Sequence, residues 1–398
     1  MIPKIIKNDV EYEAALEQLD LLMDAEAGSA ESDTLELWAT LIELYEQQAH
    51  PVELPSVIDA IRFRMDQTGL KQQDLIPYLG SRSKVSEVLS GKRSLSLAMM
   101  RKLHDGLGIP AGVLLQEPEA NLPAPMAGLD WHLFPLKTMV SRGWLSEVGA
   151  GLPVIKERAE EYLSRWAAPL GDHALEPALL RQHLRSGGKS DGYALTAWKI
   201  CVSLQALEQN LPVYQPGTIT LDFIADLVHL SYLDNGPLLA REFLHKHGIH
   251  FIVEAHLPHT HLDGAAIKLP NGAPLVALTL RHDRLDNFWF TLCHELAHVA
   301  LHFDHEDCDA FFDDLDQVEV NSLEGEADKW ASEALISSGA WKAADLCNQP
   351  TLERVRSFAA AMRIDPVIPA GRVRRETGNY RLFGKFVAGQ KVRRFFEG

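Results

Sequence analysis

The spacing of hydrophobic and polar residues predicts a chain made mostly of helices, with one short stretch of strands. In several segments apolar residues recur every three or four positions, as on the buried face of an amphipathic helix. The helical segments are residues 10–48, 72–79, 83–89, 127–215, 288–303 and 321–336. Shorter apolar runs, which are typical of strands, occupy residues 251–258, 263–269 and 273–280. The pattern therefore predicts a mainly α protein with a small β-sheet, in the α+β class.

The helix predicted over residues 288–303 carries candidate metal ligands. His294 and His298 are four residues apart, and no Pro or Gly interrupts the segment. Two His at this spacing lie one turn apart on the same face of a helix, so both imidazoles can bind one metal ion. Glu295 lies beside them and can reach a water on that metal. HExxH on a helix is the signature of zinc metallopeptidases, with a structural His pair on an amphipathic helix as the alternative.

The helix predicted over residues 321–336 supplies carboxylates for the same site. A catalytic zinc site takes three protein ligands and keeps one position open for water. Glu324 can complete a His-His-Glu set, and Asp328, one turn later, can accept a hydrogen bond from the other ring nitrogen of a liganding His. Glu326 is a competing ligand on a different side of the helix. For each carboxylate the alternative is a solvated surface group.

The HELAH sequence, followed by E-x-x-A-D-x-W-A, resembles the ImmA/IrrE family of metallopeptidases. The resemblance implies a thermolysin-like zincin domain that binds Zn²⁺, or Mn²⁺ in its place. The implied ligands are His294, His298 and Glu324, with Glu295 as the general base and Asp328 as a supporting acid. We expect a peptide substrate to lie extended along an edge strand near residues 273–280.

Residues 72–79 and 83–89, joined by a turn, have the layout of a helix-turn-helix, whose second helix enters the major groove of DNA. Residues 81–102 contain six Lys or Arg and one acidic residue, in a chain whose formal net charge is −17. This local reversal of charge favours contact with DNA over a small solvated helical pair, which is the alternative. The residues expected to face base edges are Arg82, Ser83, Lys84 and Glu87. Those expected to contact phosphates are Gln72, Lys92 and Arg93.

The N-terminal region is similar to the HigA antitoxins and their Xre-type DNA-binding relatives. The similarity is carried by residues 58–93 and 97–115. It implies a double-stranded DNA operator as a partner. It also implies that the helices of residues 10–48 support the DNA-binding core and a homodimer.

Length and composition favour two or three globular domains, because the 398 residues are 46% hydrophobic and 23% charged. The predicted order is a helical hairpin (1–50), a helix-turn-helix domain (51–116), a Pro- and Ala-rich linker (117–126), a helical connector or sensor (127–215), a metallopeptidase domain (216–349) and a basic segment (350–398). The basic segment could bind nucleic acid or, as its charge favours, the acidic body of the same molecule. Within it, Tyr380 is a candidate for stabilising the oxyanion.

Two other polar clusters have less specific patterns. His256, His259 and His261 could form a second metal site, but a polar loop is favoured because no regular element holds them. Residues 304–319 contain eight acidic residues and no Lys or Arg. A solvated loop is the expected structure, and a cover that selects basic substrates is the alternative.

The sequence predicts a cytoplasmic protein with no membrane segment. It has neither a signal peptide nor a run of 18 apolar residues, and its four Cys show no paired spacing, as expected for reduced thiols.

Together these patterns predict a DNA-binding transcriptional regulator with a zinc-dependent endopeptidase domain. Such a switch, linked to stress, a mobile element or a toxin–antitoxin pair, would cleave an Xre-type repressor or its own chain, for example in the linker 117–126. One alternative is an antitoxin-like repressor whose zincin domain only senses metal or binds a partner. Another is a protease for which the DNA-binding domain serves only to position it on DNA. Intact HExxH and Glu324 favour an enzyme, and the covalent fusion favours a regulatory role.

Overall fold

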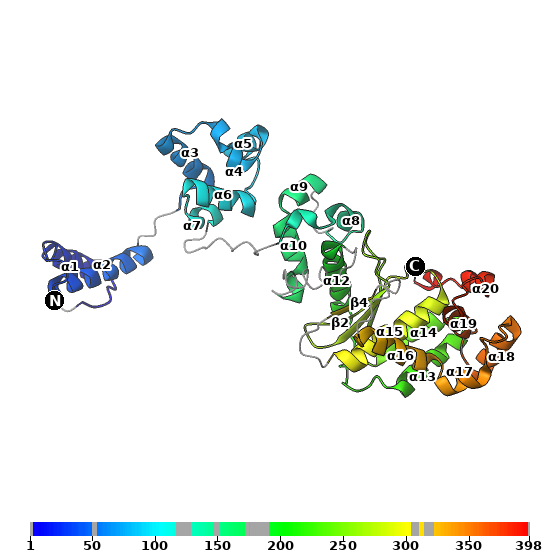
Figure 1. The fold of residues 1–398 in the computed structure, drawn as a ribbon. Coiled ribbons are helices and arrows are strands. Elements are labelled where there is room, and N and C mark those ends of the chain that lie inside the picture. The colour runs from blue at the N-terminus through cyan, green and yellow to red at the C-terminus, as the bar shows by residue number, and fades with distance from the viewer. Residues whose placement is uncertain are drawn as a thin grey trace. The chain divides into compact units, whose positions relative to one another are not determined.

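The structure is a computed structural model, and it describes residues 3–49, 54–116, 129–145, 151–171, 175, 191–303, 310–313 and 322–396. The α+β class is confirmed, because 62% of the described residues are helical and a four-stranded mixed sheet completes the fold. The chain forms two compact units, Met1–Pro123 and Ala124–Gly398 (Figure 1). The predicted linker, residues 117–126, lies outside the described residues. Among the helices that are described, none has the length and hydropathy needed to span a bilayer.

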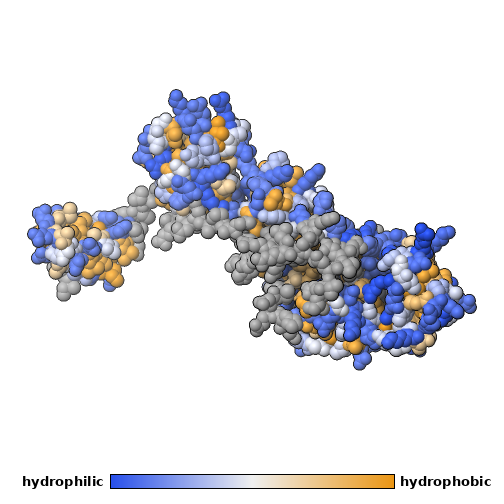
Figure 2. All heavy atoms as spheres, in the orientation of Figure 1, coloured by the Kyte–Doolittle hydropathy of each residue, from blue (hydrophilic) through white to orange (hydrophobic). Residues whose placement is uncertain are grey.

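The N-terminal hairpin consists of α1 (Asp9–Asp20) and α2 (Ala30–Ala49). The Asn8 side chain caps α1 by accepting a hydrogen bond from the backbone N–H of Glu11. The hairpin core is small and is built around the buried Trp38. Hydrophobic residues remain on its surface (Figure 2), and they include Val10, Leu16, Leu21, Met23, Leu37 and Leu44. A partner that covers them, as in the expected homodimer, remains a prediction.

The helix-turn-helix region packs around one apolar core. Its elements are α3 (Val57–Thr68), η1 (Gln72–Leu75), α4 (Ile76–Leu79), α5 (Arg82–Leu89), α6 (Leu97–Leu107) and α7 (Ala111–Leu115). The helix predicted over residues 72–79 is divided into a 3₁₀ turn and a short α-helix, because Pro77 cannot continue the hydrogen bonding of a single helix. Gly80 then turns the chain with φ 101°, and the Ser81 side chain caps α5.

In the C-terminal unit the sheet has the order β1-β3-β2-β4. Its strands are β1 (His250–Val253), β2 (Gly264–Lys268), β3 (Pro274–Leu278) and β4 (Ala310–Asp313). β1 pairs in parallel with β3, whereas β2 runs antiparallel to both β3 and β4. The expectation of an edge strand near residues 273–280 is therefore wrong. β3 is a central strand paired on both sides, and all its residues are buried, as is typical of a strand covered on both faces.

The first helices of this unit cover one face of the sheet. They are η2 (Trp131–Leu133), α8 (Leu136–Ser141), α9 (Leu152–Glu157), α10 (Ala159–Ala167), η4 (Ala168–Leu170) and α12 (Gly192–Leu207). Trp198 of α12 is fully buried in the same core as Leu275 and Ala277 of β3. The described helices of the predicted connector 127–215 therefore share a hydrophobic core with the sheet.

The opposite face of the sheet carries the longest helix of the unit, α15 (Leu285–His302) (Figure 1). The other elements of this layer are α13 (Leu221–His229), η5 (Leu230–Tyr232), α14 (Gly236–Lys246), α16 (Ser322–Leu335), α17 (Ser338–Ala344), α18 (Leu352–Met362), α19 (Val367–Thr377), α20 (Gly384–Gly389) and η6 (Arg393–Phe395).

The basic segment 350–398 contributes to this layer through buried residues of α18, α19 and α20. Its charges also contact acidic groups of the same chain. Asp283 accepts hydrogen bonds from the backbone N–H groups of Val392 and Arg393 and lies 3.5 Å from Lys391 Nζ. The charge complementarity with the acidic body of the molecule, expected from the sequence, remains a prediction.

Candidate metal centre and DNA-binding surface

The helix α15 places His294 and His298 on its buried side. The apolar side chains of Phe288, Leu292 and Leu296 anchor the helix in the core next to the sheet. The two His side chains are 1% and 0% exposed, so their orientation is set by packing. Their Nε2 atoms lie 3.0 Å apart and face one another.

Glu324 enters this site from α16. Its Oε2 atom is 3.2 Å from Nε2 of His294 and 3.4 Å from Nε2 of His298. Ala327 and Ala331 are fully buried on α16, and small side chains allow two helices to approach closely. Among the described residues, these three are the group of His, Cys, Asp or Glu whose side-chain atoms converge closely enough to hold a metal ion.

The other ring nitrogen of each His has its own partner. The Nδ1–H of His294 donates to Asp328 Oδ1 at 3.0 Å. Nδ1 of His298 shares a hydrogen bond of 2.9 Å with Nδ1 of His302. With both Nδ1 atoms engaged, the Nε2 lone pairs point to a common position beside Glu324, and this is the donor arrangement that a tetrahedral metal site requires.

His302 lies outside the HExxH motif, and the sequence patterns did not predict that it belongs to the site. It lies four residues after His298 and is 1% exposed, and its Nε2 is 3.5 Å from Glu326 Oε2. The competing ligand Glu326 therefore points to His302 rather than to the site of Glu324. The signal was present in the sequence, because the third His continues the spacing of the first two along the same helical face.

The Glu295 side chain is fully buried and lies against strand β2. At Gly264 a Cβ atom would overlap Glu295 Oε1, and it would lie 3.0 Å from Glu295 Cδ and 2.9 Å from Thr291 Cγ2. The absence of a side chain at Gly264 is therefore what gives the Glu295 carboxylate its space.

The edge strand β4 also reaches the metal centre. Phe311 of β4 stacks on the His298 ring, with 4.6 Å between ring centroids and an interplanar angle of 18°. Within the described chain, β4 pairs with β2. The edge strand next to the site is thus β4, which falls within the acidic stretch that was expected to form a loop.

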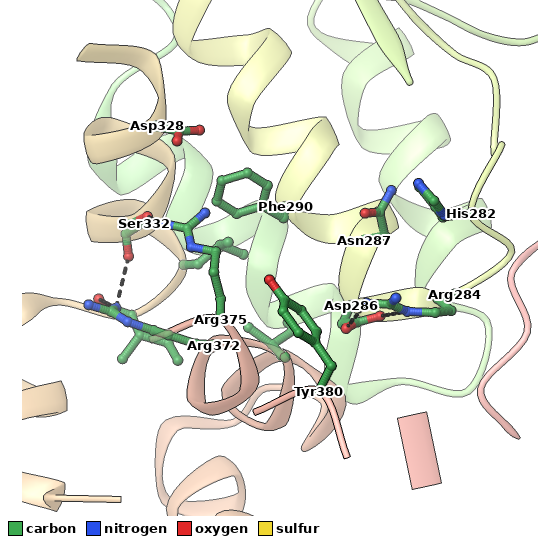
Figure 3. Close-up of a pocket in the computed structure, with 14 residues that line it drawn as sticks. His282, Arg284, Asp286, Asn287, Phe290, Asp328, Ser332, Arg372, Arg375 and Tyr380 are labelled. Atoms are coloured by element: carbon green, nitrogen blue, oxygen red, sulfur yellow. Dashed lines mark hydrogen bonds and ion pairs between the residues drawn. The ribbon is translucent and has the colours of Figure 1, made fainter. Parts of the chain in front are cut away.

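A cavity of about 480 Å³ lies between α15, α16 and α19 (Figure 3). It is lined by His282, Arg284, Asp286, Asn287, Phe290, Asp328, Ser332, Leu335, Ile336, Ile368, Gly371, Arg372, Arg375 and Tyr380. Asp328, which is hydrogen-bonded to His294, is one of the residues that line this cavity. The sequence candidate Tyr380 lies at its wall and is 61% exposed, with its ring 5.7 Å from the Arg374 guanidinium.

The seven DNA-binding candidates lie on η1, on α5 and in the turn that follows α5. Arg82 and Ser83 are exposed at the start of α5, and Lys84 is partly exposed. Gln72 is exposed at the start of η1, and Lys92 is exposed in the turn after α5. Glu87 accepts hydrogen bonds from Arg93 Nε at 2.6 Å and from Ser83 Oγ at 3.0 Å. The hydrogen bond from Arg93, reinforced by that from Ser83, lowers the pKa of the Glu87 carboxyl.

Comparison with known proteins matches each unit to a family. Residues 246–364 match the family of the IrrE N-terminal-like domain. Antitoxin HigA of Escherichia coli K12 is 36% identical over 118 residues, which are 28% of this chain and 83% of the relative. The HigA antitoxins of a second E. coli strain, O6:H1, and of Shigella flexneri match to the same extent.

The chain belongs to the HigA family. The HigA likeness lies in its N-terminal region, and an IrrE-type peptidase domain follows in the same chain.

Three described cysteines of this HigA-family protein are free thiols, Cys201, Cys293 and Cys347. Burial raises the pKa of the Cys293 thiol, so this neighbour of His294 is an unreactive core residue. His256, His259 and His261 do not form a metal-binding group with one another.

Proposed function

We propose that the protein is a DNA-binding transcriptional regulator with a zinc-dependent endopeptidase domain in the same chain. The observation that carries this proposal is the convergence of His294 Nε2, His298 Nε2 and Glu324 Oε2, with both Nδ1 atoms held by other side chains. An IrrE-type domain and a HigA-like region in one chain favour a regulatory peptidase over a degradative one.

His294, His298 and Glu324 would hold Zn²⁺, or Mn²⁺ in its place. When bound, such an ion lowers the pKa of its water and polarises the scissile carbonyl. Glu295 would take the proton of the attacking water and deliver it to the leaving amine. Asp328 would keep the His294 ring oriented, and the Tyr380 phenol would donate a hydrogen bond to the oxyanion.

The substrate would be an extended segment of an Xre-type repressor, or of this chain itself. A peptide can add to the free edge of a strand through backbone hydrogen bonds, and β4 is the edge strand that contacts His298 through Phe311. Self-cleavage within residues 117–126 is the specific form of this proposal. Incubating the protein with Zn²⁺ or Mn²⁺, with and without DNA, and mapping fragments by mass would test it. A chain that stays intact under all these conditions argues against self-cleavage.

The HigA-like region would bind a double-stranded DNA operator as a homodimer in the cytoplasm. Helix α5 would enter the major groove, with Arg82 and Ser83 near base edges and Lys92 near a phosphate. A gel-shift titration against salt would test this, because each lost phosphate contact reduces the salt dependence of binding. Lys92→Ala should reduce the slope of log affinity against log salt concentration by about one, without a change in sequence preference.

The test of the enzyme is Glu295→Gln compared with the parent chain and with Glu242→Gln, an exposed carboxylate of α14. Metal content and cleavage of the Xre-type substrate are measured on all three. Glu295→Gln should keep its metal and lose cleavage by at least about 100-fold, as expected for removal of a general base. Equal cleavage by Glu295→Gln and the parent would show that the base is another group.

A second candidate function follows from the family, since the matched relatives are antitoxins. Here the zincin domain would sense metal or bind a partner without catalysis. If the metal-loaded parent cleaves no substrate but its operator affinity changes when the metal is removed by a chelator, this second function is the correct one.

A further inference from the structure

Three arginines line the cavity beside the metal centre, and they differ in whether a carboxylate of the protein forms an ion pair with them. Arg284 donates two hydrogen bonds to the Asp286 carboxylate, at 2.9 and 2.6 Å. Arg372 Nε donates to Glu376 at 2.8 Å, and its Nη1 donates to the backbone carbonyls of Ser332 and Ile336. Each of these two arginines is thus neutralised by a carboxylate of the protein.

Arg375 differs from them, because no carboxylate of the described residues forms an ion pair with it. Its Nη2 donates to Ser332 Oγ at 3.0 Å, and its guanidinium lies 4.5 Å from the Phe290 ring centroid. Figure 3 shows the Arg375 side chain extending along the cavity towards Phe290 and Ser332. The ring and the hydroxyl hold the guanidinium in position, while the Arg375 side chain remains exposed.

Arg375 lies on α19 and is linked to the metal centre through Phe290 of α15. Phe290, which its guanidinium contacts, lies one turn before His294, and the two rings are 6.2 Å apart. Asp328, the acidic residue on the wall nearest the ligands, is engaged by His294. Asp286, another carboxylate that lines the cavity, is bound by Arg284. Among the three arginines that line the cavity, Arg375 is therefore the one whose charge no carboxylate of the described residues neutralises.

We propose that this cavity is a substrate subsite that binds a carboxylate of the peptide next to the scissile bond, with Arg375 as the residue that determines the preference. The inference rests on the proposed peptidase function. A planar guanidinium can bind a carboxylate through two parallel hydrogen bonds, which a lysine cannot do. The carboxylate can come from an Asp or Glu side chain or from the C-terminus of the peptide.

The first test is cleavage of a random peptide library by the zinc-loaded full chain, with the products identified by mass spectrometry. In the parent, one position beside the cut should favour Asp and Glu over Asn and Gln by about tenfold, the worth of one charge-assisted hydrogen bond. Arg375→Glu should invert this preference towards Lys and Arg. The matched control Arg381→Glu, an exposed arginine outside the cavity, should leave it unchanged. Libraries with amidated and with free C-termini separate a side-chain carboxylate from a terminal one.

The second test measures binding, so that it is independent of turnover. Two peptide hydroxamates that differ only by Asp or Asn are titrated against the zinc-loaded Glu295→Gln chain. The Asp probe, or a probe with a free C-terminal carboxylate, should bind about tenfold more tightly, and Arg375→Glu should remove the difference. Equal binding of all probes, or a preference that survives Arg375→Glu, overturns the subsite. If no peptide is cut but the Arg375-dependent preference in binding is present, the subsite stands and the proposed catalysis fails.

Discussion

The space that Gly264 leaves for the Glu295 carboxylate makes Gly264→Ala a direct test of the proposed base. The added Cβ would overlap Glu295 Oε1 and would lie only 2.9–3.0 Å from Thr291 Cγ2 and Glu295 Cδ. Carbon atoms normally pack at about 3.5–4.0 Å, so the carboxylate has to move by roughly 0.5–1 Å. The backbone at Gly264 does not require positive φ, and the strand itself therefore accepts alanine.

A displacement of about 1 Å in a catalytic group can reduce the rate by about 100-fold. Gly264→Ala should therefore lower kcat by about this factor while the three ligands keep their metal. Overpacking a filled site costs about 1–3 kcal/mol, which the free energy of unfolding in urea should register. The matched control is Gly339→Ala on the exposed side of α17, where a Cβ meets nothing within 4 Å and where alanine should be neutral or stabilising.

The double variant Gly264→Ala/Glu295→Ala separates the proposed cause from general damage to the strand. Once the Glu295 side chain is shortened, most of the overlap disappears, so the unfolding cost of Gly264→Ala should fall close to zero in that background. The reasoning is refuted if Gly264→Ala costs the same stability in both backgrounds. It is equally refuted if Gly264→Ala alone cleaves at the parental rate.

Of three further predictions, two concern groups around the ligands and the third concerns the buried Asp365. Asp328→Ala should weaken zinc binding by about 10- to 100-fold in a chelator competition, whereas Lys329→Ala should not; equal affinities would exclude an orienting role. His302→Leu should weaken zinc binding by about tenfold and cost roughly 1–3 kcal/mol of stability, because the buried partner nitrogen on His298 loses its hydrogen bond. Burial raises the pKa of the Asp365 carboxyl, so its ionisation opposes folding and stability falls as the pH rises through that pKa. Asp365→Asn should therefore melt above the parent at about pH 7 and with it at about pH 3, and a constant difference would contradict the assignment.

The helices that carry the metal centre were predictable because their periodicity is long and uninterrupted. The two helices were predicted over residues 288–303 and 321–336, and in the structure they span Leu285–His302 and Ser322–Leu335. The spacing of His294 and His298 puts both side chains on the same face of α15, since positions within one helix follow from residue number. Glu324 lies on the separate helix α16, so its approach to the two His depends on the packing of the two helices.

The sheet was less predictable because strand order depends on contacts that are distant in sequence. The strands β1, β2 and β3 fall in the predicted apolar runs, but the parallel pairing of β1 with β3 puts β3 in the centre. β4 was missed because its apolar residues, Phe311 and Phe312, lie in a stretch dominated by acids. It is a strand because it pairs with β2, and this pairing cannot be predicted from the local sequence pattern.

One face of α16 carries residues that contact the metal centre and residues that line the cavity. The sequence spacing of these residues extends beyond the metal ligand Glu324. Glu324, Asp328 and Ser332 follow at intervals of four residues, so they occupy the same face of the helix in successive turns. Glu324 faces the two His, Asp328 orients one of them, and Ser332 accepts a hydrogen bond from Arg375. Because these contacts are made by a single rigid helix, the position of α16 sets the ligand geometry and the place of the guanidinium together. The arginine itself comes from α19, whose approach to α15 could not be inferred from spacing, since it depends on the packing of a shared core.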